Sequence, residues 1–170
     1  WDRFAEGGAK PNAEDNTSAG HNVEFVWLLF HALDVMKEDI QPYVPMIRKQ
    51  LDHALANGID WDYGGVYVEG PHAGGVSDRE KEFWQQAEVM IGMLEGCLRF
   101  GTRVYWPAYL NVHRFVFDKM INHPVGEWWP LLNREGQPVR WTHMSHSWKV
   151  NYHTIRCMVE CIKRLEKLVS

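Results

Sequence analysis

The chain has 170 residues, of which 45% are hydrophobic and 24% are charged. A chain of this length can form one ordinary domain, and this hydrophobic share is enough for a sizeable core. The formal net charge of −4 argues against nucleic-acid binding, because no basic stripe is present to neutralise phosphates. No apolar run reaches the length of a membrane span, and three cysteines form no even disulfide framework. We therefore expect a cytoplasmic protein with reduced thiols.

The first half of the chain predicts two helices and a long loop. After an irregular segment, residues 22–37 have apolar side chains on nearly every face, which is typical of a helix buried on most sides. Residues 44–57 carry a single apolar stripe, which predicts a half-exposed helix that ends at Gly58. Residues 59–77 contain several glycine turns between aromatic and β-branched side chains, so they predict a short hairpin or a long ordered loop.

The second half predicts three further helices. The first covers residues 79–100, with Ser77 or Asp78 as its N-cap and another broad apolar set. Residues 104–121 carry one apolar stripe, and residues 152–168 follow a helical period. Between these two helices, the segment 122–147 predicts short strands around a turn at Glu135-Gly136.

The order of these helices predicts where the polar side chains of the buried helices meet. Successive helices joined by close connections run antiparallel, so the first, third and fifth helices point the same way. Their N-termini then share one end of the molecule, where the sequence places His21, Glu24, Trp84, Gln86, Glu88, Trp148 and His153. Five helices cannot cover the apolar faces of these three, so we expect further helices or a partner chain to do so.

Two histidines at the starts of separate helices indicate proton transfer on a small molecule. His21 and Glu24 lie three residues apart on one helical face, and ionisable groups on an apolar helix are costly to bury. An imidazole titrates near working pH, so His21 and His153 are a natural acid–base pair. Structural roles remain open: either histidine could cap its helix, and Glu24 could interact with the helix dipole.

Four segments in order resemble the N-acylglucosamine 2-epimerase superfamily, and cellobiose 2-epimerases in particular. The first is Gly20-His21-Asn22-Val23-Glu24 with 27–29, and the second is 83–88. The third is 126–128 with 133–136, and the fourth is Trp148-Lys149-Val150-Asn151-Tyr152-His153-Thr154-Ile155-Arg156. The sequence departs from the family pattern at Asn22, Phe83, Gln85 and Asn151. None of these departures removes an ionisable catalytic group.

The resemblance implies an all-α fold, an (α/α)6 barrel of twelve helices that is too long for this chain. Residues 1–170 would then form the C-terminal part of one such domain, about its last five helices with short β-hairpin loops, and the N-terminal half of the barrel would be missing. Such a piece is expected to be inactive alone. Oligomeric state stays open.

The resemblance also implies an isomerase that inverts C2 of a reducing sugar, such as a cellobiose-like disaccharide or an N-acylhexosamine. His21 and His153 would remove and return the C2 proton through an enediolate, and Glu24 would tune His21 or help to open the ring. Trp84 and Trp148 would stack on the sugar, and Glu88 would bind its hydroxyl groups. Gln86 would also contact substrate. This chemistry needs no metal and no other cofactor.

Other functions stay open at this stage. An aldose–ketose isomerase moves a proton from C2 to C1 on one face, and a single base can serve. A glycoside hydrolase on the same barrel would need two carboxylates, which Glu24, Glu88 or Glu127 could supply. The chain could also be a non-catalytic sugar-binding fragment, with aromatic residues that pack the core. A zinc site with His143 and His146 lacks a well-placed third ligand.

Overall fold

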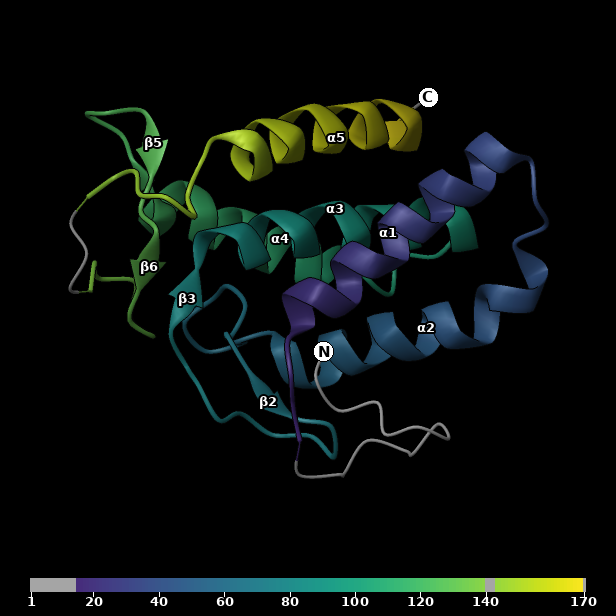
Figure 1. The fold of residues 1–170 in the computed structure, drawn as a ribbon, viewed down its shortest axis with the longest axis horizontal. Coiled ribbons are helices and arrows are strands. Elements are labelled where there is room, and N and C mark those ends of the chain that lie inside the picture. Colours follow the sequence, from purple (N-terminus) through teal and green to yellow (C-terminus); the bar gives the residue numbers. More distant parts are fainter. Residues whose placement is uncertain (1–14, 140–142, 170) are drawn as a thin grey trace.

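A computed structural model describes residues 15–139 and 143–169, and this part of the chain is mostly helical (Figure 1). The helices are α1 (Ala19–Met36), α2 (Val44–His53), α3 (Phe83–Phe100), α4 (Trp106–Phe115) and α5 (Tyr152–Val169). A 3-10 turn at Gln41–Tyr43 precedes α2. Single π-helical turns, Ala54–Gly58 and Val116–Met120, extend α2 and α4. All five predicted helices are therefore present.

Three short antiparallel strand pairs connect the loops at one end of the helices. Strand β1 (Asn16–Thr17) pairs with β2 (Gly70–Pro71), and β4 (Ile121–Asn122) pairs with β5 (Glu127–Trp128). Strand β3 (Lys81–Glu82) pairs with β6 (Leu131–Leu132), so the long loop after α4 is joined to the start of α3. The predicted turn near Glu135-Gly136 is present, between Leu132 and Pro138.

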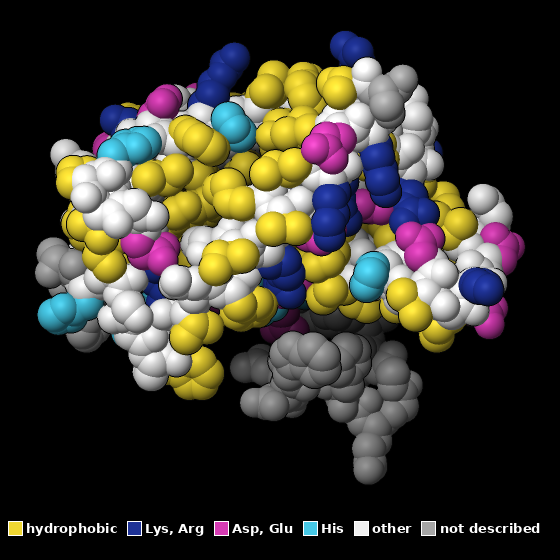
Figure 2. All heavy atoms as spheres, turned by 90° about the horizontal axis from the view of Figure 1, so that it is seen from above, with side chains coloured by type: hydrophobic (Ala, Val, Ile, Leu, Met, Phe, Trp, Pro, Cys, Tyr) yellow, Lys and Arg dark blue, Asp and Glu magenta, His cyan; other side chains and the backbone are white. Residues whose placement is uncertain are grey.

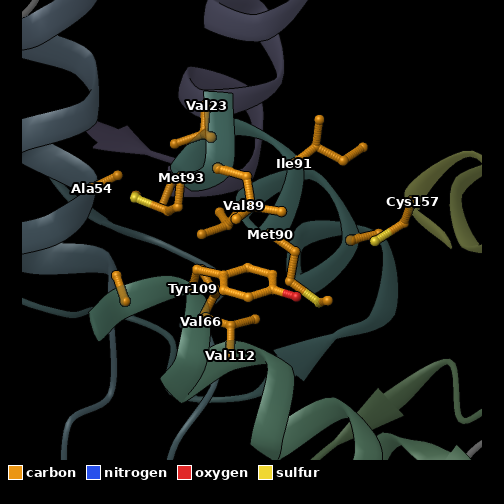
Figure 3. Packing of buried hydrophobic residues seen from close by; sticks show 14 of the residues in the cluster. Val23, Ala54, Val66, Val89, Met90, Ile91, Met93, Tyr109, Val112 and Cys157 are labelled. Carbon is orange, nitrogen blue, oxygen red and sulfur yellow. The ribbon is translucent and has the colours of Figure 1, made fainter. Parts of the chain in front are cut away.

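Helix α3 is the centre of the molecule. It packs against α1 and α5 and also against α4, while α2 packs against α1 (Figure 1). From Phe83 to Cys97 every α3 side chain except that of Trp84 is buried. Figure 3 shows Met90 and Met93 of α3 between Val23 of α1 and Tyr109 of α4. The helices approach closely because α3 has no side chain at Gly92, where a Cβ would overlap the side chain of Val23.

Two sequence-based expectations for these helices were wrong. Helix α3 begins at Phe83 rather than at residue 79, because the preceding residues Lys81 and Glu82 form β3 with a distant partner. Helix α1 is not buried on most sides: Phe25 is 48% exposed and Leu28 is 39% exposed. It packs mainly on α2 and α3, and its contacts with α5 include the ion pair of Glu24 with Arg156, whereas α3 has neighbours on several sides.

The outer faces of α1 and α5 leave apolar side chains uncovered, as the sequence predicts. The same prediction was wrong for α3, which its neighbours bury almost completely. On α5 the exposed apolar residues include Ile155, Val159 and Ile162. The view from the α5 side in Figure 2 shows hydrophobic side chains spread over this surface between scattered charges. In the described part of the chain, no helix combines the length and the hydropathy that a membrane span requires.

Candidate active site

A hollow of about 370 Å³ opens where α1, α3 and α5 begin. The residues that line it are His21, Glu24, Glu82, Phe83, Trp84, His146, Trp148, Tyr152 and His153. The volume lies within the range of small-molecule sites. The expectation that the N-termini of these three helices share one end of the molecule is therefore confirmed, and the segment before α5 reaches the same hollow.

The start of α1 places His21 in its first turn. Ser18 is the N-cap, and its hydroxyl accepts a hydrogen bond from the His21 backbone N–H. The Ser18 hydroxyl also lies 3.0 Å from Oε1 of Gln85, which connects the start of α1 to α3. Because Ser18 supplies the cap, the imidazole of His21 is left to face the hollow.

The two histidines flank a single indole. The ring centroids of His21 and Trp84 are 4.5 Å apart, and those of Trp84 and His153 are 5.8 Å apart. The phenol ring of Tyr152 also lies against His153, with centroids 3.8 Å apart. Aromatic contacts of this kind restrict ring orientation. The structure thus brings together the two predicted acid–base residues and one predicted stacking residue.

The buried carboxylate of Glu88 binds the ring of His153. Nδ1 of His153 lies 2.6 Å from Oε1 of Glu88, whose side chain has no exposed surface. The other oxygen of Glu88 accepts a hydrogen bond of 2.9 Å from the indole N–H of Trp27. An ionised carboxylate can only accept, so Nδ1 carries the proton of this bond and Nε2 is the ring atom left for a ligand.

This geometry changes the role expected for Glu88. The sequence suggested that Glu88 binds sugar hydroxyl groups, but its carboxylate is buried and does not line the hollow. Both of its oxygens already have partners within the protein. Its carboxylate contacts His153 instead. The sequence could predict only that Glu88 and His153 lie at the same end of the helices, and not that they contact each other.

Arg156 joins the two carboxylates of the site. Its Nη2 lies 2.6 Å from Oε1 of Glu88 and 2.8 Å from Oε1 of Glu24. Burial alone lowers the pKa of the guanidinium, but the two carboxylates outweigh this, and the pKa is raised above its ordinary value. Arg156 is therefore an ion-pair partner of both carboxylates.

Three side chains of this site are of the kinds that bind metal ions. Among residues 15–139 and 143–169, one group of three ligating side chains lies close together: Glu24, Glu88 and His153, with ligand atoms within 4.8 Å. The guanidinium of Arg156 lies between both carboxylates and already supplies their positive charge. His143 does not line the hollow, and His146 uses Nδ1 to accept the Trp148 N–H. The residues therefore fit an ion-pair cluster better than a metal site.

The remaining predicted substrate residues divide into one at the rim and one outside the site. Trp148 is 88% exposed and lines the hollow, and the buried side chain of Lys149 anchors its segment to Glu127. Gln86, by contrast, is fully buried and does not line the hollow. Its side-chain amide accepts from the N–H of Val66 at 2.7 Å and donates to the Val66 carbonyl at 2.9 Å. It therefore fixes the 59–77 loop, which corrects its predicted role.

Sequence reasoning did not assign four residues of the hollow to the site: Glu82, Phe83, His146 and Tyr152. Tyr152 and His146 both line it, although Tyr152 was noted only as part of a motif and His146 only as a zinc candidate. The position of Tyr152 beside His153 on the first turn of α5 could have identified it. Nothing in the sequence places His146 there, because its position depends on the path of the loop before α5.

The fold of the described chain is similar to that of solved sugar epimerases. A solved cellobiose 2-epimerase from Spirochaeta thermophila superimposes with a TM-score of 0.80 at 26% identity, covering 98% of this chain and 41% of that one. The family model described as N-acylglucosamine 2-epimerase matches residues 9–157. The chain therefore belongs to the N-acylglucosamine 2-epimerase family.

Relatives in this family are named for two kinds of sugar isomerisation. A cellobiose 2-epimerase of Eubacterium cellulosolvens is 26% identical over 152 residues, which cover 88% of this chain and 36% of the relative. A D-mannose isomerase of Marinomonas mediterranea is 28% identical over 149 residues, which cover 86% of this chain and 36% of the relative. The chain thus matches little more than a third of the length of these curated relatives.

Proposed function

We propose that the chain belongs to a sugar 2-epimerase that inverts C2 of a reducing-end aldose. The observation that carries the proposal is that His21 and His153 contact one indole, that of Trp84, at the mouth of a single hollow. Inversion of a carbon centre is most simply achieved by a base on one face and an acid on the other. Family membership and the names of the relatives support the same class of reaction.

The proposed reaction is a proton transfer at C2 of the open-chain sugar. One imidazole takes the C2 proton, and the electron pair of the C–H bond forms the C1–C2 double bond while the carbonyl π electrons move to oxygen. The protonated imidazole on the other side then returns a proton to the opposite face of C2. The first turns of three helices face this hollow, and their partial positive charge favours the anionic oxygen.

The other residues of the site position these two imidazoles and the sugar. Glu88 keeps the proton of His153 on Nδ1, so Nε2 is the atom that exchanges a proton with C2. Glu24 lines the hollow one turn after His21 and is held by Arg156, where it can accept a hydrogen bond from the sugar. Trp84 and Trp148 offer indole faces for the C–H surface of the ring.

We also propose that this chain is the C-terminal part of an (α/α)6 barrel. The uncovered apolar faces of α1 and α5, and the coverage of about a third of each relative, support this arrangement. Helices α1, α3 and α5 would form part of the inner ring, and α2 and α4 would lie outside them. The missing helices would complete the pocket around the substrate.

An aldose–ketose isomerase is the second candidate. It is favoured by the similarity to a D-mannose isomerase, which is as high as the similarity to the cellobiose 2-epimerase. In that reaction the proton returns to C1 and the product is a ketose. A glycoside hydrolase is disfavoured, because it needs two carboxylates and, of the three candidates, only Glu24 lines the hollow. Glu88 is buried against Arg156, and Glu127 binds Lys149.

The proposal is tested by replacing His21 and His153 separately with Ala in the full-length protein. Each replacement is expected to abolish C2 inversion of a reducing disaccharide, followed by NMR, while His31→Ala on the same helix α1 retains the wild-type rate. If either active-site variant still inverts C2 at a rate near that of the wild type, the two-base assignment is wrong. A ketose as the main product would instead identify the isomerase.

A further inference from the structure

A second hollow, of about 460 Å³, lies between the turn after α2 and helix α4. It shares no lining residue with the hollow at His21 and His153. Its walls carry two aromatic rings from the turn, Trp61 and Tyr63, and side chains from α4 and the π-turn after it. Trp61 is 52% exposed and Tyr63 is 50% exposed, so two large rings face solvent in one place.

The turn that carries these rings is held rigidly by backbone and side-chain hydrogen bonds. The Asp60 carboxylate accepts from the backbone N–H groups of Asp62 and Tyr63, each at 3.1 Å. The N–H of Gly65 donates to Oδ1 of Asn111 on α4, and Nδ2 of Asn111 donates to the Asp60 carbonyl. Asn111 thereby fixes the distance between the turn and α4.

A buried ionic cluster also holds the turn that carries Trp61 and Tyr63. The Asp60 carboxylate and the Lys81 ammonium are fully buried and lie 3.0 Å apart. Arg134, from the loop after β6, binds both Asp60 and Asp62, and its guanidinium lies 4.6 Å from the centroid of the Tyr63 ring. Ordering aromatic side chains before a ligand arrives reduces the entropy lost on binding.

The polar groups of this hollow indicate an uncharged ligand. Its lining carboxylates, Asp62 and Asp118, are matched by the lining cations Arg114 and Lys119. Such a balanced set offers donors and acceptors for hydroxyl groups but favours neither an anion nor a cation. Exposed indole and phenol faces suit the C–H surface of a pyranose ring, and the walls are polar on the other side.

We propose that Trp61 and Tyr63 form a carbohydrate-binding site for a neutral oligosaccharide, separate from the site of the proposed reaction. A pyranose ring would stack on these two side chains, with its hydroxyl groups directed at Arg114 and Asp118 across the hollow. The site would hold a sugar chain without chemical change. It does not depend on the proposed epimerase activity.

The test is calorimetric titration of the full-length protein with the methyl β-glycoside of cellotriose. This probe is neutral, and its blocked anomeric carbon prevents ring opening, so binding is measured without any reaction. Trp61→Ala and Tyr63→Ala are each expected to weaken binding about tenfold, while Trp61→Phe keeps most of the affinity. Tyr43→Ala, at an exposed aromatic residue of the 3-10 turn before α2, is expected to leave the affinity within about twofold of that of the wild type.

Three outcomes would overturn the proposal. The first is no detectable binding by the wild type at tens of millimolar glycoside. The second is equal binding by wild type and Trp61→Ala, with near-ultraviolet circular dichroism showing that the variant is folded. The third is that the wild type self-associates and does not bind the glycoside, while Trp61→Ala no longer self-associates. This surface would then be an interface between copies of the chain. A failure of the proposed epimerase activity would change none of these measurements.

Discussion

Nδ1 of His153 lies 2.6 Å from Oε1 of Glu88, a carboxylate with no exposed surface. The pair connects the first turn of α5 to the second turn of α3, the most enclosed helix of the described chain. The indole of Trp27 and the guanidinium of Arg156 hold the same carboxylate. The proton of this bond leaves Nε2 of His153 as the atom that can exchange a proton with a ligand.

Replacing Glu88 with Gln in the full-length protein should therefore lower kcat while KM changes little. A neutral amide carries no charge to stabilise the imidazolium and can also donate to Nδ1 of His153, which favours the wrong tautomer. Loss of such an orienting carboxylate lowers rates by roughly 10²-fold or more. KM should be insensitive because Glu88 does not line the hollow. Steady-state kinetics of C2 inversion measure both quantities.

Glu95 provides the matched control for Glu88. It lies on the same helix, is 4% exposed and binds two arginines, Arg99 and Arg164. Both Glu95→Gln and Glu88→Gln should lower the free energy of unfolding, because each removes a buried charge from its arginine partners, but Glu95→Gln should leave kcat unchanged. If Glu88→Gln raises KM and keeps the wild-type kcat, the orienting role is wrong and Glu88 binds the sugar.

Stability in acid should depend on Asp60. Burial raises the pKa of this carboxyl, but hydrogen bonds from Arg134 and Lys81 outweigh burial and hold the pKa well below its ordinary value. A carboxyl with a depressed folded pKa stabilises the protein above its unfolded pKa, and this contribution is lost as pH falls through the folded pKa. The wild type should therefore lose stability from about pH 4 downward.

The variant Asp60→Asn should separate this effect from general acid denaturation. Near pH 7 it should be less stable than the wild type by ~3–5 kcal/mol, because Lys81 stays buried without its anion. Urea unfolding at a series of pH values should show this difference shrinking below about pH 4. Asp62→Asn, whose side chain is 80% exposed, should change stability by no more than ~0.5 kcal/mol. A difference that stays constant with pH would contradict the account.

The outer face of α5 should be buried in the full-length protein. Val159 is 43% exposed in this chain and lies between Ile155 and Ile162, both more exposed. If helices outside these 170 residues cover this face, Val159→Asp buries an unpaired charge and should cost about 3 kcal/mol of stability. Thermal or urea unfolding of the full-length protein measures the cost.

Val125 is the control for this prediction, because it is 62% exposed in the turn between β4 and β5. Val125→Asp should change the free energy of unfolding by no more than ~0.5 kcal/mol. Equal, small effects of Val125→Asp and Val159→Asp would mean that α5 faces solvent in the whole protein. The proposed continuation of the barrel over this face would then be wrong.

The sequence predicted features that depend on local periodicity and missed those that depend on distant pairing. The last helix was expected at residues 152–168 and is Tyr152–Val169, since its apolar period is regular. The start of α3 was misplaced because β3 pairs with β6, some fifty residues later in the chain. Secondary structure made by a long-range partner leaves no periodic signal in the segment itself.

The same distinction applies to the candidate site. Helical spacing and parallel directions were enough to predict that His21, Trp84 and His153 meet, and the structure brings them together. The direction of a side chain around its helix was not predictable at Glu88 and Gln86, which are buried and hold protein groups. Which face of α3 each one occupies depends on packing against α1, α5 and the 59–77 loop.

The central claim is that His21 and His153 act on opposite faces of C2 of a reducing sugar. The most direct test follows exchange of the C2 hydrogen in D₂O, with each of the two epimers as the starting sugar. The proteins are the full-length wild type, His21→Gln and His153→Gln. In a two-base reaction, each base removes the C2 proton from only one epimer.

Neither variant should invert C2. His21→Gln should still exchange the C2 hydrogen of one epimer, and His153→Gln should exchange that of the other epimer, because each variant retains one working base. Inversion by either variant at close to the wild-type rate, or loss of exchange from the same single epimer in both variants, would contradict the placement of one base on each face.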